Sequence, residues 1–538
     1  MLYRSPIRLL PLILSAALLA TGCKTVSEET PPIMTRIEAS TTAATTVDTL
    51  SAENLSEMVG NAEETSETAA EMTETETAKT ETEIVTEKST ETAAETAVIS
   101  EETTTSAPET TAAAETTTAP ETTAVPETTT EETTTVTVLT IQSESPPETT
   151  VQTTAETESA SVYYGSNSYN ALNFREQKGF WITYLEYGSI LKNKSQSSFR
   201  KSIGSYFDNI SELGFNTVYV QVRAFGDAYY DSDLYPSGEQ FDGTIGTSND
   251  FDALQVMIDC AHERGMSIHA WINPMRLMYT SQLEAIDNSY PIKKWYNSDK
   301  YNGTYIVKSG DRWYLNPAYS EVTDLIASGI TEIAANYDVD GIQIDDYFYP
   351  TTDASFDKSA YSASGTDLSL SDWRIANVNR MVKKLYKAAH NANSTIVFGI
   401  SPQGSVDNNY NQLYADVKTW CRSSGYCDYI LPQVYFGFDN VALPYADVIS
   451  LWNSMVKSDD VKLVIGLAAY KIGAEDTYAG KGGKNEWLNN SDIISRQMTL
   501  AETLDNYGGV AIYRYDSLFN PDSSVAAQVD KEIENIAK

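Results

Sequence analysis

The sequence holds few of the residues that usually build metal sites or nucleophilic sites. Among its 538 residues are only four cysteines and three histidines, and neither a Cys-x-x-Cys pair nor a His-Glu-x-x-His motif occurs. A structural zinc site and a zinc-protease centre are therefore not predicted, and no metal or cofactor is expected. Ser401 lies in Gly-Ile-Ser-Pro and not in a Gly-x-Ser-x-Gly elbow, which argues against a serine nucleophile.

Basic residues are also scarce. The chain has 37 Lys and Arg against 75 Asp and Glu, a formal net charge of −38. Much of this imbalance lies between Lys24 and Ser161, where 29 acidic residues accompany 4 basic ones. The rest of the chain is moderately acidic and shows no basic stripe. Nucleic acid is therefore not expected as a partner.

Long apolar runs are missing, apart from one at the start of the chain. The run Leu9–Ala20 follows Arg4 and Arg8 and precedes Ala-Thr-Gly-Cys23. It is too short to span a bilayer, so residues 1–22 are predicted to be a signal peptide. The end of this segment resembles a bacterial lipoprotein signal, which implies lipidation of Cys23 and an extracytoplasmic, lipid-anchored location in the cell envelope or at the surface. Ordinary secretion is the alternative.

Aromatic residues are absent from residues 23–161, which consist largely of Thr, Glu, Ala and Ser with repeats such as Ala107-Pro-Glu-Thr-Thr and Ala119-Pro-Glu-Thr-Thr. Such a segment cannot bury enough apolar surface to offset the entropy of ordering it. We therefore predict a disordered Thr/Glu/Ala-rich tether that holds a folded domain, residues 162–538, away from the membrane.

From Lys178 onward, short apolar segments alternate with amphipathic ones. Period-2 patterns predict eight strands, at residues 179–184, 215–222, 266–273, 339–345, 395–401, 428–435, 462–468 and 509–514. Helical patterns lie at residues 199–213, 252–264, 320–336, 373–391, 410–422, 445–455 and 492–504. This order is typical of a (β/α)₈ TIM barrel. A doubly wound open sheet is the alternative, but no Gly-rich strand-to-helix turn is present.

The most informative strand is the one that ends in two adjacent carboxylates, Asp345 and Asp346. Ile342 and Ile344 share one face of this strand, whereas Gln343 shares the other face with Asp345. In an α/β barrel the second face points inward, so Asp345 would project at the C-terminal mouth, where active sites lie. The alternative for either Asp is a structural role in capping a helix or binding loop amides.

Several other predicted strands end in polar or aromatic residues with the same parity. They form a polar pocket if the barrel closes. The strand-end residues are Arg223, His269, Trp271, Asn273, Ser401, Gln433 and Tyr435. Aromatic residues also gather in the loops after strands, and flat rings beside Asp, Asn and Gln suit sugar rings. Some of these aromatics are instead expected to pack their own loops.

Six motifs together resemble the glycosyl-hydrolase-like family 10 domain, which is distinct from the family 10 xylanases. They are Gln221-Val-Arg223-Ala-Phe-Gly-Asp227, His269-Ala-Trp271-Ile-Asn273-Pro-Met-Arg276, Tyr314-Leu-Asn316-Pro, Asp340-Gly-Ile-Gln343-Ile-Asp345-Asp346-Tyr347-Phe-Tyr-Pro350, Phe398-Gly-Ile-Ser401-Pro and Pro432-Gln433-Val-Tyr435. The resemblance spans about residues 178–516 and implies a TIM-barrel glycosidase fold of bacterial envelope proteins. It also implies Asp345 and Asp346 as catalytic candidates and Arg223, His269, Asn273, Arg276 and Gln433 in the pocket. Further candidates for substrate binding are Asp227, Gln343 and Tyr347.

Glycoside hydrolysis ordinarily uses two carboxyl groups, one protonated and one ionised. Adjacent residues of an extended strand point to opposite sides, so a partner from another strand end is expected, with Asp345 as the acid. The candidates for this partner are Glu186, Asp227, Asp439, Glu475, Asp476 and Asp516. The central motif is also similar to the family 18 glycosidase signature, but Gln343 and Tyr347 replace its middle Asp and its catalytic Glu.

The sequence as a whole predicts a glycoside hydrolase that acts on a cell-envelope (peptidoglycan-like) or external polysaccharide. A non-catalytic glycan-binding barrel and a surface adhesin on a stalk are the alternatives. Cys421 and Cys427 are close enough in sequence for a disulfide, although two buried thiols fit equally well.

Overall fold

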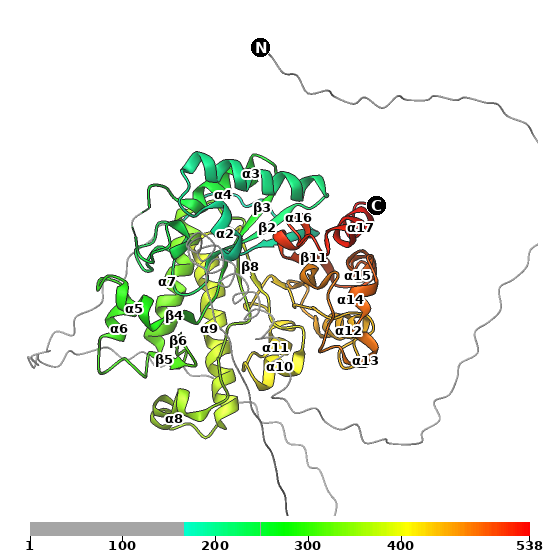
Figure 1. The fold of residues 1–538 in the computed structure, drawn as a ribbon. Coiled ribbons are helices and arrows are strands. Elements are labelled where there is room, and N and C mark those ends of the chain that lie inside the picture. Colours follow the sequence, from blue (N-terminus) through cyan, green and yellow to red (C-terminus); the bar gives the residue numbers. More distant parts are fainter. Residues whose placement is uncertain (1–165, 248) are drawn as a thin grey trace, which may run out of the picture. The chain divides into compact units, whose positions relative to one another are not determined.

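We analysed a computed structural model, which describes residues 166–247 and 249–538 (Figure 1). The predicted signal peptide, the predicted tether and Cys23 lie outside these residues. None of the helices in the described part is both long and apolar enough to cross a membrane.

Eight parallel strands close into a barrel, as the sequence predicted. In ring order they are β1 (Gln177–Ile182), β11 (Tyr507–Tyr513), β10 (Lys462–Ala468), β9 (Tyr429–Ile430), β8 (Val397–Ile400), β7 (Gly341–Ile344), β3 (Ser267–Ile272) and β2 (Thr217–Arg223). All neighbouring strands are parallel, and the chain passes through helical segments between them. The fold is therefore the (β/α)₈ barrel.

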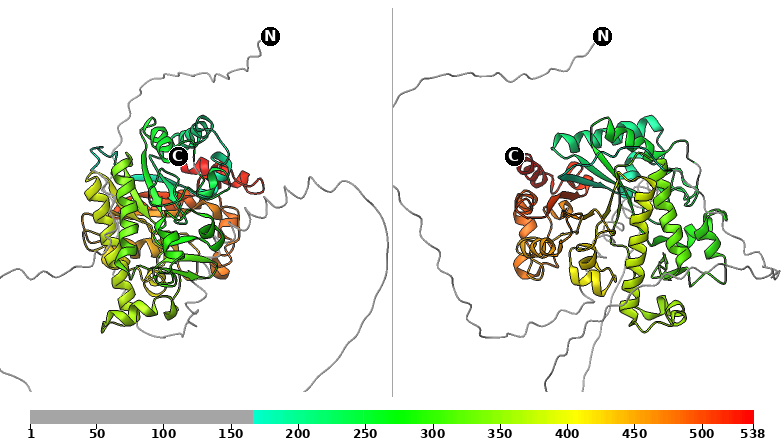
Figure 2. Two further views of the ribbon diagram at one scale, coloured as in Figure 1. Left: turned by 90° about the vertical axis from the view of Figure 1, so that its left-hand side faces the viewer. Right: turned by 180° about the vertical axis from the view of Figure 1, so that it is seen from behind.

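Helices cover the outside of this ring. The longer ones are α3 (Gln196–Glu212), α4 (Ala253–His262), α7 (Ser320–Asn336), α9 (Leu370–Ala392), α12 (Tyr445–Met455), α15 (Ile493–Ala501) and α17 (Ala526–Ile536). The shorter ones are α2 (Tyr184–Ile190), α5 (Thr280–Ala285), α6 (Pro291–Tyr296), α8 (Lys358–Ser364), α10 (Val406–Asn411), α11 (Val417–Trp420), α13 (Gly480–Gly483), α14 (Glu486–Asn489) and α16 (Tyr515–Phe519). Single 3₁₀ turns lie at Glu239–Phe241, Ala354–Phe356 and Ala469–Lys471. The two longest neighbours, α7 and α9, pack side by side (Figure 2).

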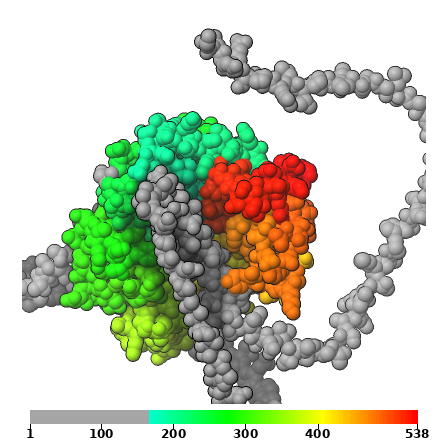
Figure 3. All heavy atoms as spheres, in the orientation of Figure 1, coloured from blue at the N-terminus to red at the C-terminus, as the bar shows by residue number. Residues whose placement is uncertain are grey.

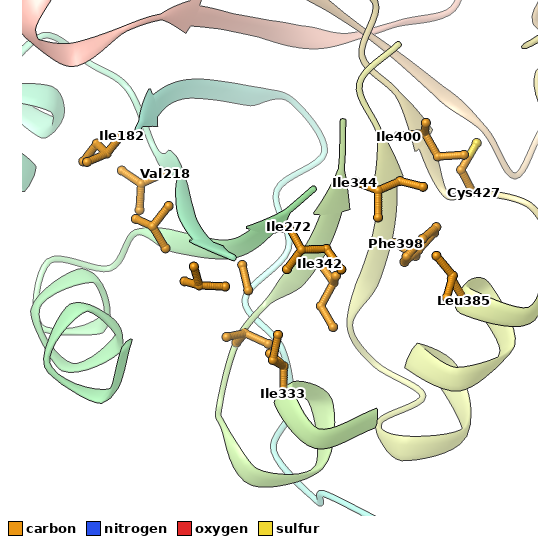
Figure 4. Packing of buried hydrophobic residues seen from close by; sticks show 14 of the residues in the cluster. Ile182, Val218, Ile272, Ile333, Ile342, Ile344, Leu385, Phe398, Ile400 and Cys427 are labelled. Atoms are coloured by element: carbon orange, nitrogen blue, oxygen red, sulfur yellow. The ribbon is translucent and has the colours of Figure 1, made fainter. Parts of the chain in front are cut away.

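The outer face of the ring forms the main hydrophobic core. Ile342 and Ile344 of β7 are fully buried, as their predicted face required, and Ile333 of α7 belongs to the same apolar cluster (Figure 4). Phe398 of β8 and Leu385 of α9 continue the cluster along the next strand (Figure 4). Burying each such side chain contributes about 1.5–3 kcal/mol to the free energy of unfolding, so this layer holds the outer face of the strands against the helices.

The inner face alternates large rings with glycines. A Cβ atom at Gly399 would overlap the ring of Tyr429, and one at Gly341 would lie 2.7 Å from the ring of His269. Glycine on one strand thus makes room for a ring on its neighbour, and side chains fill the interior of the barrel. The functional site must therefore lie above this filling, at the C-terminal ends of the strands.

The first and last parts of the described chain meet beside β1. The rings of Tyr206 in α3 and Tyr515 in α16 stack with centroids 3.6 Å apart. In the space-filling view, the C-terminal helices and the segment around α3 accordingly adjoin on the surface (Figure 3). Next to the N-terminal end of β7, Tyr169 donates a 2.8 Å hydrogen bond to Asp340 and so ties the start of the described chain to the barrel.

Three features differ from the expectation. The predicted strand at residues 428–435 forms regular ladder pairs only over β9, because Pro432 has no N–H to donate. The predicted helix at residues 410–422 divides into α10 and α11 around Tyr414, whose φ is 56°. A small antiparallel sheet of β4 (Arg276–Tyr279), β6 (Arg312–Leu315) and β5 (Ile306–Ser309) follows β3, and the sequence analysis had missed it.

Candidate functional site

His269 and Gln343 lie inside the barrel, below the mouth. His269 Nδ1 is 2.8 Å from the hydroxyl of Tyr429, and burial lowers the pKa of His269 to about 4. Gln343 accepts a 2.7 Å hydrogen bond from the indole of Trp181 and approaches the same Tyr429 hydroxyl at 3.4 Å. Both residues thus belong to a neutral hydrogen-bonded layer that supports the floor of the site.

Asp345 lies at the upper edge of this layer. Its Oδ2 accepts a 3.0 Å hydrogen bond from the indole N–H of Trp271, and its Oδ1 accepts one of 3.3 Å from the backbone of Tyr347. The side chain is almost fully buried. The indole of Trp271 thus ties the carboxyl group of Asp345 to β3, the neighbouring strand.

Asp346 is half-buried and faces the ends of β8 and β9. Gln403 Nε2 donates to Asp346 Oδ2 and Gln433 Nε2 donates to Oδ1, each at 3.1 Å. Burial raises the pKa of Asp346, although both amide donors and the positive charge of Arg276 act in the opposite direction. Each of the two adjacent carboxyl groups thus accepts two N–H donors, and those of Asp346 come from the segments after β8 and β9.

On the side of β2 and β3, two arginines alternate with three aromatic rings. Arg312 Cζ lies 3.7 Å from the ring centroid of Tyr279 and 4.0 Å from that of Phe225. Arg276 Cζ lies 4.7 Å from the centroid of Phe225 and 4.2 Å from that of Tyr347. These cation–π contacts order the mouth next to the carboxylates and place positive charge there. Arg312 and Tyr279 come from the small antiparallel sheet.

On the opposite side, three tyrosines pack together after β9, β10 and β11. The ring centroids of Tyr435, Tyr470 and Tyr513 are 5.7–6.0 Å apart. Tyr435 and Tyr513 are tilted by 34° to each other, and Tyr470 stands nearly perpendicular to both. Each ring is half-buried. We call this group of three half-buried rings the tyrosine platform.

Two more predicted pocket residues lie on strands that flank β7. Asn273 Oδ1 accepts a 2.9 Å hydrogen bond from Gln221, whereas the buried Asn273 Nδ2 has no partner. The buried hydroxyl of Ser401 also lacks a partner. These polar groups lie above β3 and β8, the neighbours of the strand that carries both carboxylates.

Arg223 lies elsewhere. The pairing between β2 and β3 shifts register between Gln221 and Arg223, and this irregularity turns Arg223 to the outside of the ring. Its guanidinium packs against Gly329 of α7 and lies 4.4 Å from the ring centroid of Tyr235. Strand parity had placed Arg223 at the mouth, but the structure buries it beneath α7.

Asp227 holds the loop that follows β2. It accepts backbone hydrogen bonds from Ala224 at 3.0 Å and from Phe225 at 2.8 Å, and burial raises its pKa. Its visible role is therefore to fix the position of Phe225 within the alternating rings and guanidinium groups.

The other carboxylates considered as partners are mostly engaged in other contacts. Glu186 is fully buried and pairs with Arg514, which also contacts Asp516. Because β11 lies opposite β7 in the ring, these groups lie across the mouth from Asp345 and Asp346. The remaining candidates form ion pairs or are exposed: Asp476 with Lys471, Glu475 with Lys484, and the exposed Asp439.

Four residues at the mouth were not predicted from the sequence: Gln403, Tyr470, Tyr513 and Arg312. Gln403 lies two residues after Ser401, so extending the inward parity past the strand end would have found it. Tyr513 likewise follows Gly509 and Ala511 on the inner face of β11. No comparable signal existed for Arg312, because the sheet that carries it was not recognised.

Three of the four cysteines lie in the described part of the chain. Cys260, Cys421 and Cys427 are free and buried, so the thiol alternative for Cys421 and Cys427 describes this structure. Within residues 166–247 and 249–538, no group of three or more His, Cys, Asp or Glu side chains is arranged to hold a metal ion.

Comparison with known proteins identifies related sequences. The model of the family described as glycosyl hydrolase-like 10 matches residues 176–480. The glycosyl hydrolase DigH of Escherichia coli K12 is 32% identical over 340 residues, which cover 59% of this chain and 76% of that protein. The glycosyl hydrolase YngK of Bacillus subtilis 168 is 32% identical over 331 residues, 56% of this chain and 62% of that protein. The glycoside hydrolase domain of PgaB (BpsB) from Bordetella bronchiseptica is similar at 13% identity and a TM-score of 0.46, over 66% of this chain and 98% of that chain.

Proposed function

Because the chain belongs to the glycosyl hydrolase-like 10 family, we propose that it hydrolyses glycosidic bonds of a cell-envelope (peptidoglycan-like) or external polysaccharide. Asp346 is the proton donor and Asp345 is its ionised partner. The observation that carries this proposal is the pair of adjacent carboxyl groups at the mouth of the barrel, of which Asp346 has a pKa that burial raises. From the sequence, Asp345 was expected to be the acid, whereas in this proposal Asp346 has that role.

The proposed reaction uses each carboxyl group once. Asp346 transfers its proton to the glycosidic oxygen as the bond from that oxygen to the anomeric carbon breaks. The negative charge of Asp345 stabilises the positive charge that develops on the sugar ring. Water then bonds to the anomeric carbon, and its released proton restores the acid form of Asp346.

The two sides of the mouth supply binding surfaces of different chemistry. The tyrosine platform presents aromatic faces on which the C–H faces of sugar rings can stack. Arg276 and Arg312 offer positive charge on the other side, and the charge of Arg276 acts on Asp346. In this proposal Trp271, Asn273, Tyr347, Ser401, Gln433 and Tyr435 line or support the binding site, whereas His269 and Gln343 support it from below.

The test is product release from defined glycans. The full-length protein, Asp346→Asn and Asp345→Asn are incubated with purified peptidoglycan glycan strands and with soluble envelope polysaccharides, and new reducing ends are quantified. We expect release by the wild type and a loss of at least about 10²-fold in each variant. Asp338→Asn is the matched control, because this exposed Asp lies at the opposite end of β7. Equal release by all four proteins would refute the proposal.

A second candidate is a glycan-binding protein without catalysis. The tyrosine platform favours it, because stacking on these rings needs neither carboxylate. Glycan retention by the wild type without reducing-end release from any polysaccharide would select this candidate.

We also propose that lipid on Cys23 anchors the protein outside the cytoplasm. The proposal is supported by the apolar run that precedes Cys23 and by the length of the Thr/Glu-rich segment that follows. Labelling of the wild type by an alkyne fatty acid, lost in Cys23→Ala, is expected. Equal labelling of both proteins would contradict the assignment.

A further inference from the structure

We propose that Gln403 is a positioning residue for the reaction, which holds the carboxyl plane of Asp346 in the orientation needed for proton transfer. This inference rests on the proposed function and goes beyond it, because Gln403 touches the substrate in no step. It acts through Asp346 Oδ2, to which its side-chain amide donates at 3.1 Å.

The orientation of the Gln403 amide is set by its second contact. Asn408 Nδ2 donates a 3.1 Å hydrogen bond to Gln403 Oε1. Because Asn408 Nδ2 donates to the amide oxygen of Gln403, the NH₂ group of the same amide faces Asp346. The contact to Asp346 is therefore chemically defined at both ends of the amide.

The backbone around Gln403 is equally well fixed. The side chain of Asn409 accepts from the Gln403 N–H at 3.2 Å and donates to its carbonyl at 2.6 Å. The indole of Trp452 donates to the carbonyl of Gly404 at 2.8 Å. A Cβ atom at Gly404 would lie 2.5 Å from the carbonyl oxygen of Gln433, so glycine permits the two chain segments to approach. Gln403 thus stands on a rigid support, as a positioning residue requires.

Gln403 and Gln433 together fix the rotation of the carboxyl group. One amide contacts each oxygen of Asp346, so neither oxygen can turn away without losing a contact. Gln433 Nε2 also contacts the carbonyl of Ser401 at 3.2 Å and divides its donors between two acceptors. Gln403 is therefore the residue whose removal should free the carboxyl group most selectively.

Kinetics of full-length Gln403→Ala give the first arm of the test. We expect kcat to fall about ten- to hundred-fold, the effect of losing one hydrogen bond to a charged group, with little change in KM. Because the amide donor stabilises the carboxylate, its loss should also move the alkaline limb of the pH–rate profile upward by about one unit. Gln412→Ala, which removes an amide next to the same short helix, should match the wild type.

The second arm does not need enzymatic activity. With ¹³C-carboxyl-labelled Asp, the resonance of Asp346 is identified by its loss in Asp346→Asn and titrated in each protein. We expect an upward shift of the midpoint in Gln403→Ala and a smaller one in Asn408→Ala, which keeps Gln403 but loosens its amide. An unchanged midpoint in Gln403→Ala would overturn the inference. Absence of hydrolysis by the wild type would refute the proposed function alone, because this titration still decides the role of Gln403.

Discussion

The buried imidazole of His269 should make the barrel sensitive to acid. His269 is 1% exposed, and its Nδ1 contacts the Tyr429 hydroxyl, so the folded protein holds the ring neutral until its pKa of about 4. In the unfolded chain the same ring gains a proton near its ordinary pKa of about 6.5. The stabilising contribution is therefore complete above about pH 6.5 and is lost as the pH falls from there to about 4.

The size of this effect follows from the two pKa values. A difference of roughly 2.5 units at about 1.36 kcal/mol per unit gives about 3 kcal/mol between neutral pH and about pH 4. For a folded part of about 370 residues, this corresponds to roughly 4 °C in the melting temperature.

A difference between two proteins isolates the contribution of His269. His269→Gln replaces the ring by an amide that does not titrate and can still contact Tyr429. The free energy of unfolding is measured by chemical denaturation of both proteins at pH 7.5 and at pH 4. We expect the wild type to lose about 3 kcal/mol more than the variant over this interval. The same loss in both proteins would refute the account of His269.

Three further predictions concern packing, charge and binding. Gly399→Ala should destabilise the protein by about 1–3 kcal/mol, because its Cβ meets a Tyr ring in the barrel. Gly188→Ala, at an exposed position of α2, should be neutral or stabilising. Equal effects of the two substitutions on thermal unfolding would contradict this packing. Asp346→Asn should raise the free energy of unfolding at neutral pH, since burial penalises the charged carboxylate. This gain in stability should vanish below about pH 3.8, where the carboxyl group is protonated in the unfolded chain as well. A gain that is independent of pH would refute the stated cause. Tyr470→Ala should weaken glycan retention about two- to tenfold, because it removes one ring of the tyrosine platform. Substitution of the exposed Tyr478 by Ala should leave retention unchanged. Equal retention by both variants would exclude the tyrosine platform as a glycan-binding surface.

The barrel could be predicted because each strand carries its own signal. Alternation of apolar and polar residues identified all eight strands and the outward face of Ile342 and Ile344. The small antiparallel sheet was missed because its strands are only four residues long and contain charged side chains. The Gly310-Asp311 pair between two of these strands was a hairpin signal that could have revealed it.

The site was less predictable because it depends on how neighbouring strands are paired. The polar ends of β3, β7, β8 and β9 do come from consecutive strands of the ring. A register shift beside Arg223 cannot be read from a period-2 pattern, and it reverses the direction of that side chain. The different environments of Asp345 and Asp346 arise from Trp271 and Gln403, which lie far from them in sequence. No local pattern could assign their roles.

The most direct test of the central claim, that Asp346 donates the proton, is the dependence of hydrolysis on the leaving group. A variant without its acid should be slow on a natural glycan, yet it should retain turnover of an aryl glycoside whose leaving group departs without protonation. We predict this behaviour for Asp346→Asn, whereas Asp345→Asn should be impaired on both substrates. Equal impairment of Asp346→Asn on both substrates would contradict the assignment.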